Sequence, residues 1–378
     1  MGKSLNGKEL GKGISQRKDG LYQARFINRF GKRETIYANT LNDIRQQLRN
    51  KQYEDEKSIN VITKEMTLDE WYEIWMNTCK MNCRNTTKVT YAKHYKRIQK
   101  ELGYMKLTNL NLIVLQQAFN KLKSDNERKN SKKILVDMLE KAIYADLIIK
   151  NVAKQINTKV SKEEKKERRV LTIEETKLFL RQAENSIYYN LFVLALETGL
   201  RIGELLALAW SDIDMNRQVL YVRHTLCYYC KDGKYVFEMH DTKTKNGKRM
   251  IPLTNKAYEA LQNQRRLKLE IERKCGKAEE YENLIFVTKN NRPTQLFIVK
   301  ETIELCVRNI QKEHPEFERF SPHCLRHTFA TRAVENGMPY KTLQKILGHG
   351  SLQMTMDLYC HVTDDTLFEA MQLMEKAM

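Results

Sequence analysis

The sequence predicts a multidomain, mainly helical protein with small β-sheets, and three observations lead to this prediction. The chain has 378 residues, which is enough for two or three domains. It contains only 5 Pro and 15 Gly, a composition typical of a folded and largely helical chain. Short alternating runs bounded by turn residues occur near residues 14–38 and again near residues 218–252, and such runs predict small sheets.

Residues 1–60 predict a small domain of three strands followed by one helix. Lys18-Asp19-Gly20 is a typical hairpin turn, and residues 28–32 hold a second turn. Thr40 is placed to cap a helix that ends near residue 56. The three strands are expected at residues 14–17, 21–27 and 33–38.

The predicted strands carry many basic side chains. Long cations and aromatic rings on a sheet can read base edges in a major groove, so this domain is a candidate for DNA binding. An ordinary solvated sheet is the alternative. The side chains expected on the exposed faces are Arg17, Lys18, Gln23, Arg25, Arg29, Lys32 and Arg33, interleaved with Tyr22, Phe26 and Tyr37.

Residues 61–160 predict a helical domain. Thr67 and Glu70 form a capping box that opens its first helix. Trp71 and Trp75 lie four residues apart, so they share a helix face and are expected in the core. Three further helices are expected at residues 86–102, 110–123 and 129–147. The outward faces, which suit either a DNA-binding domain or a helical spacer, are expected to carry Lys88, Lys93, His94, Lys96, Arg97 and Lys100.

Residues 161–169 are charged and lack apolar anchors, which predicts an exposed linker before a third domain at residues 170–378. A capping box at Thr172 and Glu175 opens this domain. Strands are expected at residues 218–222, 235–239 and 248–252. Helices are expected at residues 190–197, 202–210 and 343–347, with others that begin at Ser321-Pro322 and at Ser351.

The charge of the chain points to its class of partner. The formal net charge is +19, with basic residues spread along the whole chain, and this favours a polyanionic partner that the protein wraps. A basic protein without such a partner, or one drawn to an anionic membrane surface, is the alternative. No apolar run approaches the ~20 residues of a membrane span, and the start lacks the apolar segment of a signal peptide. We therefore expect a cytoplasmic protein that is not bound to a membrane.

The eight cysteines are scattered and imply no disulfide framework. Cys227 and Cys230, with two histidines nearby, would allow a zinc site, but the turn residues that follow favour a β-hairpin instead. Cys324 and Cys360 are expected to be small buried side chains.

Six side chains of the third domain suit the chemistry of a phosphodiester. Arginine grips non-bridging oxygens through its planar fork, lysine and histidine can transfer protons, and tyrosine can act as a covalent nucleophile. An acidic cluster of the kind that holds magnesium does not accompany them in the sequence, so we expect side chains to supply the positive charge. The six candidates are Arg201, Lys243, His323, Arg326, His349 and Tyr359.

The order and separation of these residues resemble the tyrosine recombinase (phage-type integrase) family, and most of all the integrases of conjugative transposons. All six positions of the family pattern are filled. The resemblance implies an arm-type DNA-binding domain at residues 1–60, a helical core-binding (SAM-like) domain at residues 61–160 and a catalytic domain at residues 170–378. The motifs read Thr-Gly-Leu-Arg201-Ile-Gly-Glu, Thr-Lys243-Thr-Lys-Asn-Gly-Lys-Arg, His323-Cys-Leu-Arg326-His-Thr, Leu-Gly-His349 and Asp-Leu-Tyr359.

The resemblance also implies a mechanism that needs no metal, cofactor or ATP. Tyr359 would attack a scissile phosphate and form a 3′-phosphotyrosyl link, while Lys243 would protonate the leaving 5′ oxygen. Lys245 is a rival for that proton transfer, since it lies only two residues away. The spacing to the strand that follows favours Lys243.

The remaining candidates would hold the phosphate. The resemblance implies that Arg201 and Arg326 neutralise its non-bridging oxygens. His323 would help to take the tyrosine proton, and His349 would donate a hydrogen bond to the phosphate. The tail at residues 364–378 is amphipathic and would pack on its own chain or on a neighbouring protomer.

The expected function is site-specific recombination for a mobile genetic element, in integration and also in excision. The partners that the resemblance implies are double-stranded DNA with core-type and arm-type sites, a homotetramer on the DNA synapse and an accessory excision factor. A chromosomal-type recombinase, a DNA-binding regulator with an inert site and a monomeric type IB topoisomerase-like enzyme are the alternatives. The sheet predicted at the amino terminus favours the mobile-element integrase.

Overall fold

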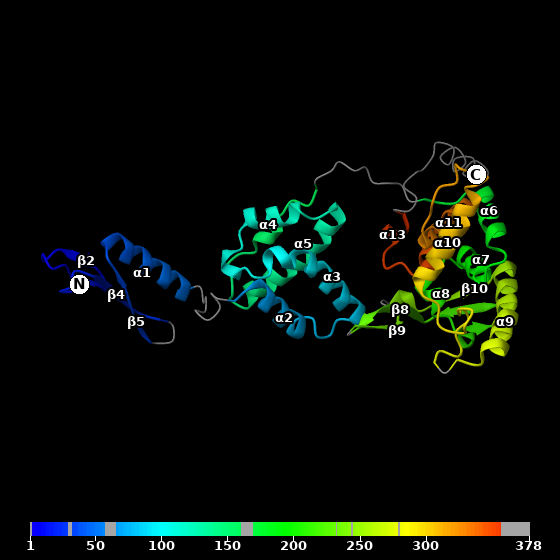
Figure 1. Cartoon of the computed structure of the whole chain (residues 1–378), viewed down its shortest axis with the longest axis horizontal. Coiled ribbons are helices and arrows are strands. Elements are labelled where there is room, and N and C mark those ends of the chain that lie inside the picture. Colours follow the sequence, from blue (N-terminus) through cyan, green and yellow to red (C-terminus); the bar gives the residue numbers. More distant parts are fainter. Residues whose placement is uncertain are drawn as a thin grey trace, which may run out of the picture. The chain divides into compact units, whose positions relative to one another are not determined.

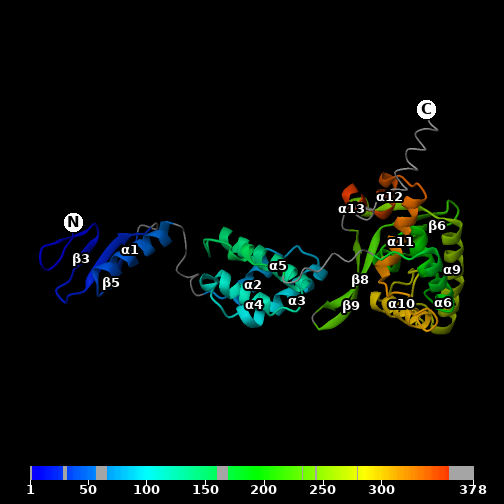
Figure 2. The ribbon, with the colours of Figure 1, turned by 90° about the horizontal axis from the view of Figure 1, so that it is seen from above.

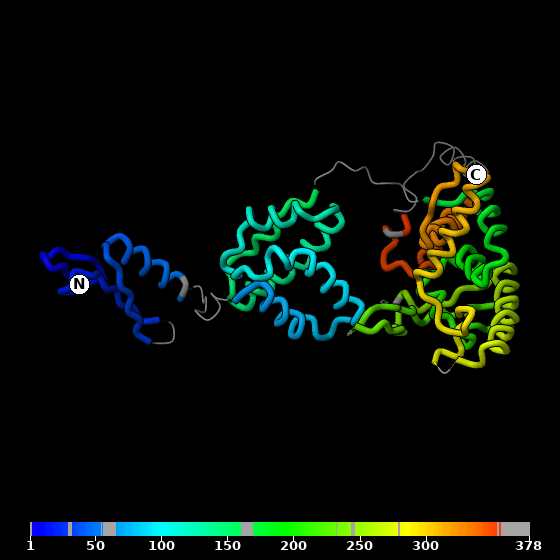
Figure 3. Tube along the Cα trace, in the orientation of Figure 1, coloured from blue at the N-terminus to red at the C-terminus, as the bar shows by residue number. Residues whose placement is uncertain are grey.

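The computed structural model describes seven stretches of the chain, which fall into two compact units, residues 1–163 and 164–378. Figure 3 follows the trace through both units. The described stretches are residues 2–28, 32–56, 66–159, 169–231, 233–242, 245–278 and 280–356. The predicted linker at residues 161–169 therefore lies outside them, except for Arg169.

The first part of unit one contains two small antiparallel sheets and a helix (Figure 1). The predicted strands and the helix capped by Thr40 are confirmed, and the Thr40 hydroxyl accepts from the Asp43 backbone N–H at 3.1 Å. A hairpin of two shorter strands, which was not predicted, precedes them. The bounds are β1 Gly2–Lys3, β2 Glu9–Gly11, β3 Ile14–Gln16, β4 Tyr22–Ile27, β5 Arg33–Ala38 and α1 Leu41–Glu56.

One face of the β3-β4-β5 sheet packs against α1 and the other is exposed. Tyr22 and Phe26 lie on the packed side with the buried Ala24, so the prediction that they are exposed was wrong. Arg25 and Tyr37 lie on the open side, as predicted. The open face is thus basic and contains one exposed aromatic ring.

The second part of unit one is a helical bundle with its own core, which includes Trp71 and Trp75 as predicted. The Trp71 indole donates to the Met138 carbonyl at 2.9 Å, and the Trp75 indole donates to Asp137 at 3.1 Å. The Thr67–Glu70 capping box is also confirmed. The bounds are α2 Leu68–Thr78, α3 Asn85–Leu102, η2 Leu107–Asn109, α4 Leu112–Asn120, α5 Asp125–Tyr144 and η3 Val152–Gln155.

Two details of this bundle differ from the prediction. Helix α5 begins at Asp125, because the Ser124 hydroxyl accepts from the Glu127 backbone N–H and caps the helix there. His94 and Arg97 are not outward cations, because the Arg97 guanidinium contacts His94 at 2.8 Å and pairs with Glu127 at 3.0 Å. Lys93, Lys96 and Lys100 are exposed as predicted.

Unit two packs helices around one large apolar core, beside a three-stranded sheet and a long hairpin (Figures 1 and 2). The sheet has the order β10-β7-β6 and is antiparallel throughout. The hairpin of β8 and β9 turns between Lys231 and Lys234. The strands are β6 Ile213–Asp214, β7 Val219–Val222, β8 His224–Lys231, β9 Lys234–Asp241 and β10 Arg249–Pro252.

The helices of unit two confirm most of the prediction. The Thr172–Glu175 capping box opens α6, but the helix expected over residues 202–210 ends at Leu206. Helices α9 and α10 were not predicted. The bounds are α6 Ile173–Ala183, α7 Tyr189–Thr198, α8 Ile202–Leu206, η4 Trp210–Asp212, η5 Lys245–Gly247, α9 Asn255–Cys275, α10 Leu296–Ile310, α11 Pro322–Glu335, α12 Tyr340–Leu347 and α13 Leu352–Met356.

The Cys227 and Cys230 pair lies on β8, opposite Glu238 and Tyr235 of β9. Residues three apart on a strand point to opposite faces, so these thiols do not converge on one ion. Within the described residues, no group of three or more His, Cys, Asp or Glu is placed to hold a metal. The described helices also include none that is both long and apolar enough to span a bilayer.

Candidate active site

The end of α7 positions the first candidate, Arg201. Gly199 closes the helix with φ +62°, a left-handed conformation that favours glycine. A Cβ at this position would lie 2.3 Å from the Phe329 ring and 2.9 Å from Leu347, so the turn also requires the smallest residue for packing. Two residues later Arg201 occupies the N-cap position of α8, and its side chain is 39 % exposed.

Arg326 is a buried guanidinium at the centre of this region. It lies on α11, which packs against α7 and α12, and its exposed fraction is 3 %. Its Nη1 donates to the Gly199 carbonyl at 2.8 Å, and its Nη2 donates to the Leu347 carbonyl at 2.7 Å. The side chain therefore joins the turn before Arg201 to the end of α12, and both orphan carbonyls gain a charged donor.

His349 follows directly on the end of α12. Gly348 has φ +65°, a left-handed conformation that favours glycine and turns the chain so that it presents the histidine. The His349 side chain is buried, and its Nδ1 lies 2.9 Å from the Thr355 hydroxyl of α13. Thr355 was not singled out from the sequence, although it stands six residues after His349, near the end of the short helix α13.

The environment of His349 is strongly cationic. Burial, which is the largest cause, and the positive charges of Arg326, Arg201, Arg249 and His323 together lower the pKa of the imidazole to about 4. All four groups affect the His349 ring because they lie close to it. The structure thus brings four predicted site residues together, and His349 is neutral at physiological pH.

Glu204 holds Arg201 from the side of α8. Its carboxylate accepts from the Arg201 backbone N–H at 3.0 Å and from Nη1 at 2.8 Å. Arg249 of β10 binds the same carboxylate, at 2.9 Å from Nη2 and 3.3 Å from Nη1. Burial raises the pKa of Glu204, but the hydrogen bond from Arg249 and the charges of both arginines outweigh it, so the net pKa is lowered.

Arg249 is a second residue of this region, after Thr355, that sequence reasoning missed. A signal was present, because Arg249 and Ile251 are two residues apart on one strand and therefore share a face. Ile251 is 2 % exposed and belongs to the core, so Arg249 points inward as well. A buried arginine requires a carboxylate or carbonyl partner, which here are Glu204 and the end of α12.

His323 lies at the start of α11, one turn before Arg326. Its ring meets the His327 ring edge-on, with centroids 4.7 Å apart. Ser321 is at the N-cap position and Pro322 at the first helical position, as predicted, although the Ser321 side chain makes no capping hydrogen bond. His323 is exposed, so it is accessible to a substrate, whereas Arg326 is buried.

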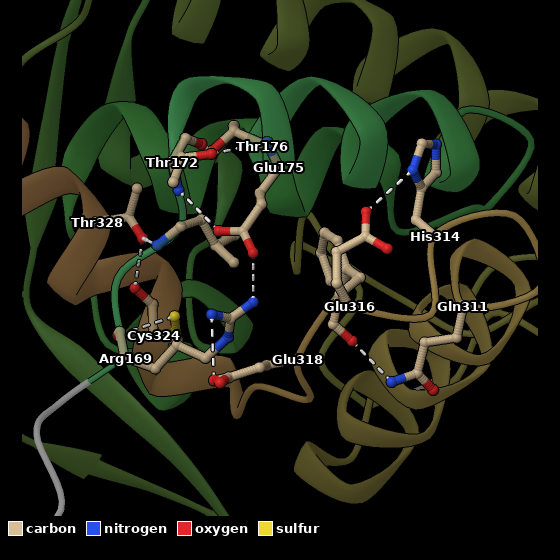
Figure 4. A network of polar contacts seen from close by, with 12 residues as sticks. Arg169, Thr172, Glu175, Thr176, Gln311, His314, Glu316, Glu318, Cys324 and Thr328 are labelled. Atoms are coloured by element: carbon tan, nitrogen blue, oxygen red, sulfur yellow. Dashed lines mark hydrogen bonds and ion pairs between the residues drawn. The ribbon is translucent and has the colours of Figure 1, made fainter.

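A polar network fixes the start of α11 to α6 (Figure 4). The Leu171 backbone N–H donates to the Thr328 hydroxyl at 3.0 Å, and the Cys324 thiol donates to the Arg169 carbonyl at 3.1 Å. Arg169 also pairs with Glu175 at 2.6 Å. Burial raises the pKa of Cys324 to about 11, so the thiol stays protonated, in agreement with the small buried side chain expected there.

Lys243 and Tyr359 lie outside the described residues, as do Cys360, the tail at residues 364–378 and the side chain of Lys245. The described residues beside them do contact the site. Asn246, in the turn before β10, donates to the His349 carbonyl at 3.5 Å. Thr355, four residues before Tyr359, bonds the His349 ring.

Comparisons with known proteins agree with this geometry. The sequence profile of the phage integrase family matches residues 168–366, and that of the phage integrase N-terminal SAM-like domain matches residues 67–123. The transposase from transposon Tn916 of Enterococcus faecalis is 27 % identical over 397 aligned positions, which cover 98 % of this chain and 96 % of the relative. A XerC-like tyrosine recombinase of Caldanaerobacter subterraneus subsp. tengcongensis is 28 % identical and covers 80 % of this chain and 81 % of its own.

Solved structures give the same result. The Tn1549 transposon integrase in complex with a circular intermediate DNA has a TM-score of 0.71 and 27 % identity, and covers 82 % of this chain and 99 % of its own. A lambda integrase dimer bound to a core site, at 18 % identity and a TM-score of 0.56, shares the fold. The chain belongs to the phage integrase family and is a tyrosine recombinase, an enzyme of site-specific DNA recombination.

Proposed function

We propose that the protein is the integrase of a mobile genetic element, acting on double-stranded DNA in integration and in excision. The observation that carries the proposal is the convergence of Arg201, His323 and Arg326 around a neutral His349. The similarity to the Tn916 transposase extends over 98 % of the chain, which is too much to leave out the β3-β4-β5 sheet. The match to the XerC-like recombinase covers 80 % of the chain, which supports a chromosomal role less well.

In the proposed reaction Tyr359 is the nucleophile. Its phenolic oxygen forms a bond to the scissile phosphorus, the bond from phosphorus to the 5′ oxygen breaks, and Lys243 protonates that oxygen. The phenolic proton passes to His323. A 5′-hydroxyl of the partner strand then reverses the step, so the energy of the phosphodiester is kept in the protein link.

The arginines and His349 stabilise the charge that develops on the phosphate. Arg326 is already oriented by the Gly199 and Leu347 carbonyls, and Arg201 by Glu204, so little reorganisation is needed when the phosphate arrives. His349 is neutral, and a Thr355 hydroxyl that donates to its Nδ1 leaves a proton on Nε2. The Nε2–H group can then donate a hydrogen bond to a phosphate oxygen.

The proposed division of labour follows the domains expected from the sequence. Residues 1–60 would bind arm-type sites through the open face of β3-β4-β5, where Arg25 and Arg33 are exposed. Residues 61–160 and 170–378 would bind the core-type site, joined by the linker at residues 161–169. A homotetramer on the synapse and an excision factor would complete the assembly, with the tail packing on its own or a neighbouring protomer.

Covalent capture of DNA tests the proposal. A nicked duplex that loses a short 5′-hydroxyl fragment after cleavage cannot be religated, so the protein remains attached. Wild-type protein should form this adduct on element-end DNA, and Tyr359→Phe should bind the DNA with unchanged affinity and form none. A Tyr359→Phe adduct would reject the nucleophile, and absence of any wild-type adduct would favour the inert DNA-binding regulator.

A further inference from the structure

Arg249 is a buried cation to which the proposed reaction gives no role. Its side chain is 6 % exposed, and Glu204 beside it is 4 % exposed. The guanidinium donates to both oxygens of Glu204, to the Gly247 carbonyl at 3.0 Å and, through Nε, to the Ile346 carbonyl. Every nitrogen of its fork is therefore committed to a partner from another part of unit two, and this fixes the guanidinium in one orientation.

The first consequence concerns charge. Glu204 is shared by Arg201 and Arg249, so the three groups together carry one net positive charge. Without Arg249, the whole carboxylate charge would fall on Arg201, and in a buried setting that pairing is strong. Arg201 would then present little net charge to a phosphate, although its side chain would be unchanged in position.

The second consequence concerns the turn that presents His349. Arg249 binds the Ile346 carbonyl, and Arg326 binds the Leu347 carbonyl one residue later. A Cβ at Gly348 would lie 3.0 Å from the Arg249 Nη1, so the guanidinium packs directly under the turn. The end of α12 is thus held by two arginines, one of which touches the phosphate in the proposed reaction and one of which does not.

We propose that Arg249 is a positioning residue for DNA cleavage. It balances the charge of Glu204, so that Arg201 is oriented by the carboxylate but keeps its positive charge for the phosphate, and it holds the turn that carries His349. This inference rests on the proposed function. It adds to the same site one more residue that DNA cleavage requires. This role distinguishes Arg249 from an arginine that only stabilises the fold.

The test uses the full-length chain and the nicked core-site duplex described above. Three variants are compared with wild type: Arg249→Lys, Arg249→Met and the double variant Arg249→Met with Glu204→Gln. Lys268→Met is the matched control, because Lys268 is 3 % exposed in the same unit and its ammonium binds Asn291 at 2.8 Å and Glu272 at 3.4 Å. For each protein the single-turnover capture rate, the Kd for the duplex and the urea unfolding midpoint are measured.

The charge argument gives a distinct order of rates. Arg249→Met should capture DNA about 100-fold more slowly with a Kd within about 3-fold of wild type, because the loss falls on the transition state. The double variant should recover about 10-fold, since the unbalanced carboxylate is gone. Arg249→Lys keeps the charge and should stay within about 3-fold of wild type. Lys268→Met should be destabilised and yet capture within about 3-fold.

Other results would overturn the inference. One is an Arg249→Met rate close to that of wild type in folded protein. Another is a double variant no faster than Arg249→Met, or a Lys268→Met control that slows as much as Arg249→Met. If Arg249→Met does not fold, Arg249→Lys must still exceed the double variant by at least about 3-fold, and equal rates would reject the role. Absence of capture by wild type would reject the proposed function together with the inference.

Discussion

Replacing Arg326 by methionine should affect stability and cleavage together, and both effects follow from its contacts. Methionine keeps an unbranched side chain but removes the Nη donors to the Gly199 and Leu347 carbonyls. Each buried carbonyl left without its partner costs about 1–2 kcal/mol, so the unfolding free energy should fall by about 2–4 kcal/mol. For a unit of this size that corresponds to a Tm lower by about 5–15 °C.

The rate of DNA cleavage should fall by more than the loss of unfolding free energy explains. Loss of a preorganised cation at the transition state slows such reactions by about 10²–10³-fold, so capture should fall at least that much at a temperature where the variant is folded. Calorimetry and the covalent-capture assay measure the two effects. The control is Arg332→Met on the same helix, where the lost bonds go to the Thr172 carbonyl and the Thr176 hydroxyl. A Tm equal to wild type, or a capture defect no larger than that of Arg332→Met, would refute the assigned contacts.

Three further predictions follow from single residues. The folded pKa of His349 is about 4 against 6.5 unfolded, so its contribution to stability is complete above about pH 6.5 and is lost as the pH falls towards 4, by about 3 kcal/mol at most. Urea unfolding between pH 4.5 and 7.5 should show a flatter dependence for His349→Asn, and equal slopes would contradict the buried neutral ring. Gly199→Ala should cost about 2–4 kcal/mol, because its φ is +62° and the Phe329 ring lies 2.3 Å from the added Cβ, and a urea midpoint within error of wild type would exclude that clash. Arg25→Ala should weaken arm-site binding and lower its salt dependence by about one phosphate contact with core-site capture unchanged, whereas an unchanged arm-site affinity and salt dependence would count against the arm-binding role.

Much of the fold was predictable because the local signals are strong. The capping boxes at Thr67 and Thr172 depend on neighbouring residues alone, and each lies where the sequence predicts it. The inward position of Tyr22 follows from the same local pattern, because Tyr22 is two residues from the buried Ala24 on one strand and therefore shares its face.

Other features depend on contacts between residues distant along the chain. Arg97 pairs with Glu127, thirty residues later, so helical periodicity on one helix could not show that the cation is engaged. Arg249 meets Glu204 across forty-five residues, and only the sheet and the turn together place it there. The site motifs indicated which residues converge, but not the buried ion pair behind them, because a motif records order and spacing and not burial.

The most direct test of the central claim is to identify the amino acid that becomes joined to DNA. Wild-type protein is trapped on the nicked duplex, digested with protease and nuclease, and the nucleotide-bearing peptide is sequenced by mass spectrometry. The expected result is one adduct, a 3′-phosphate linked to Tyr359, formed equally well in excess EDTA. A link to any other side chain, such as Tyr340 or Ser351, or an adduct that disappears with the chelator, would contradict a tyrosine nucleophile assisted by arginine, lysine and histidine.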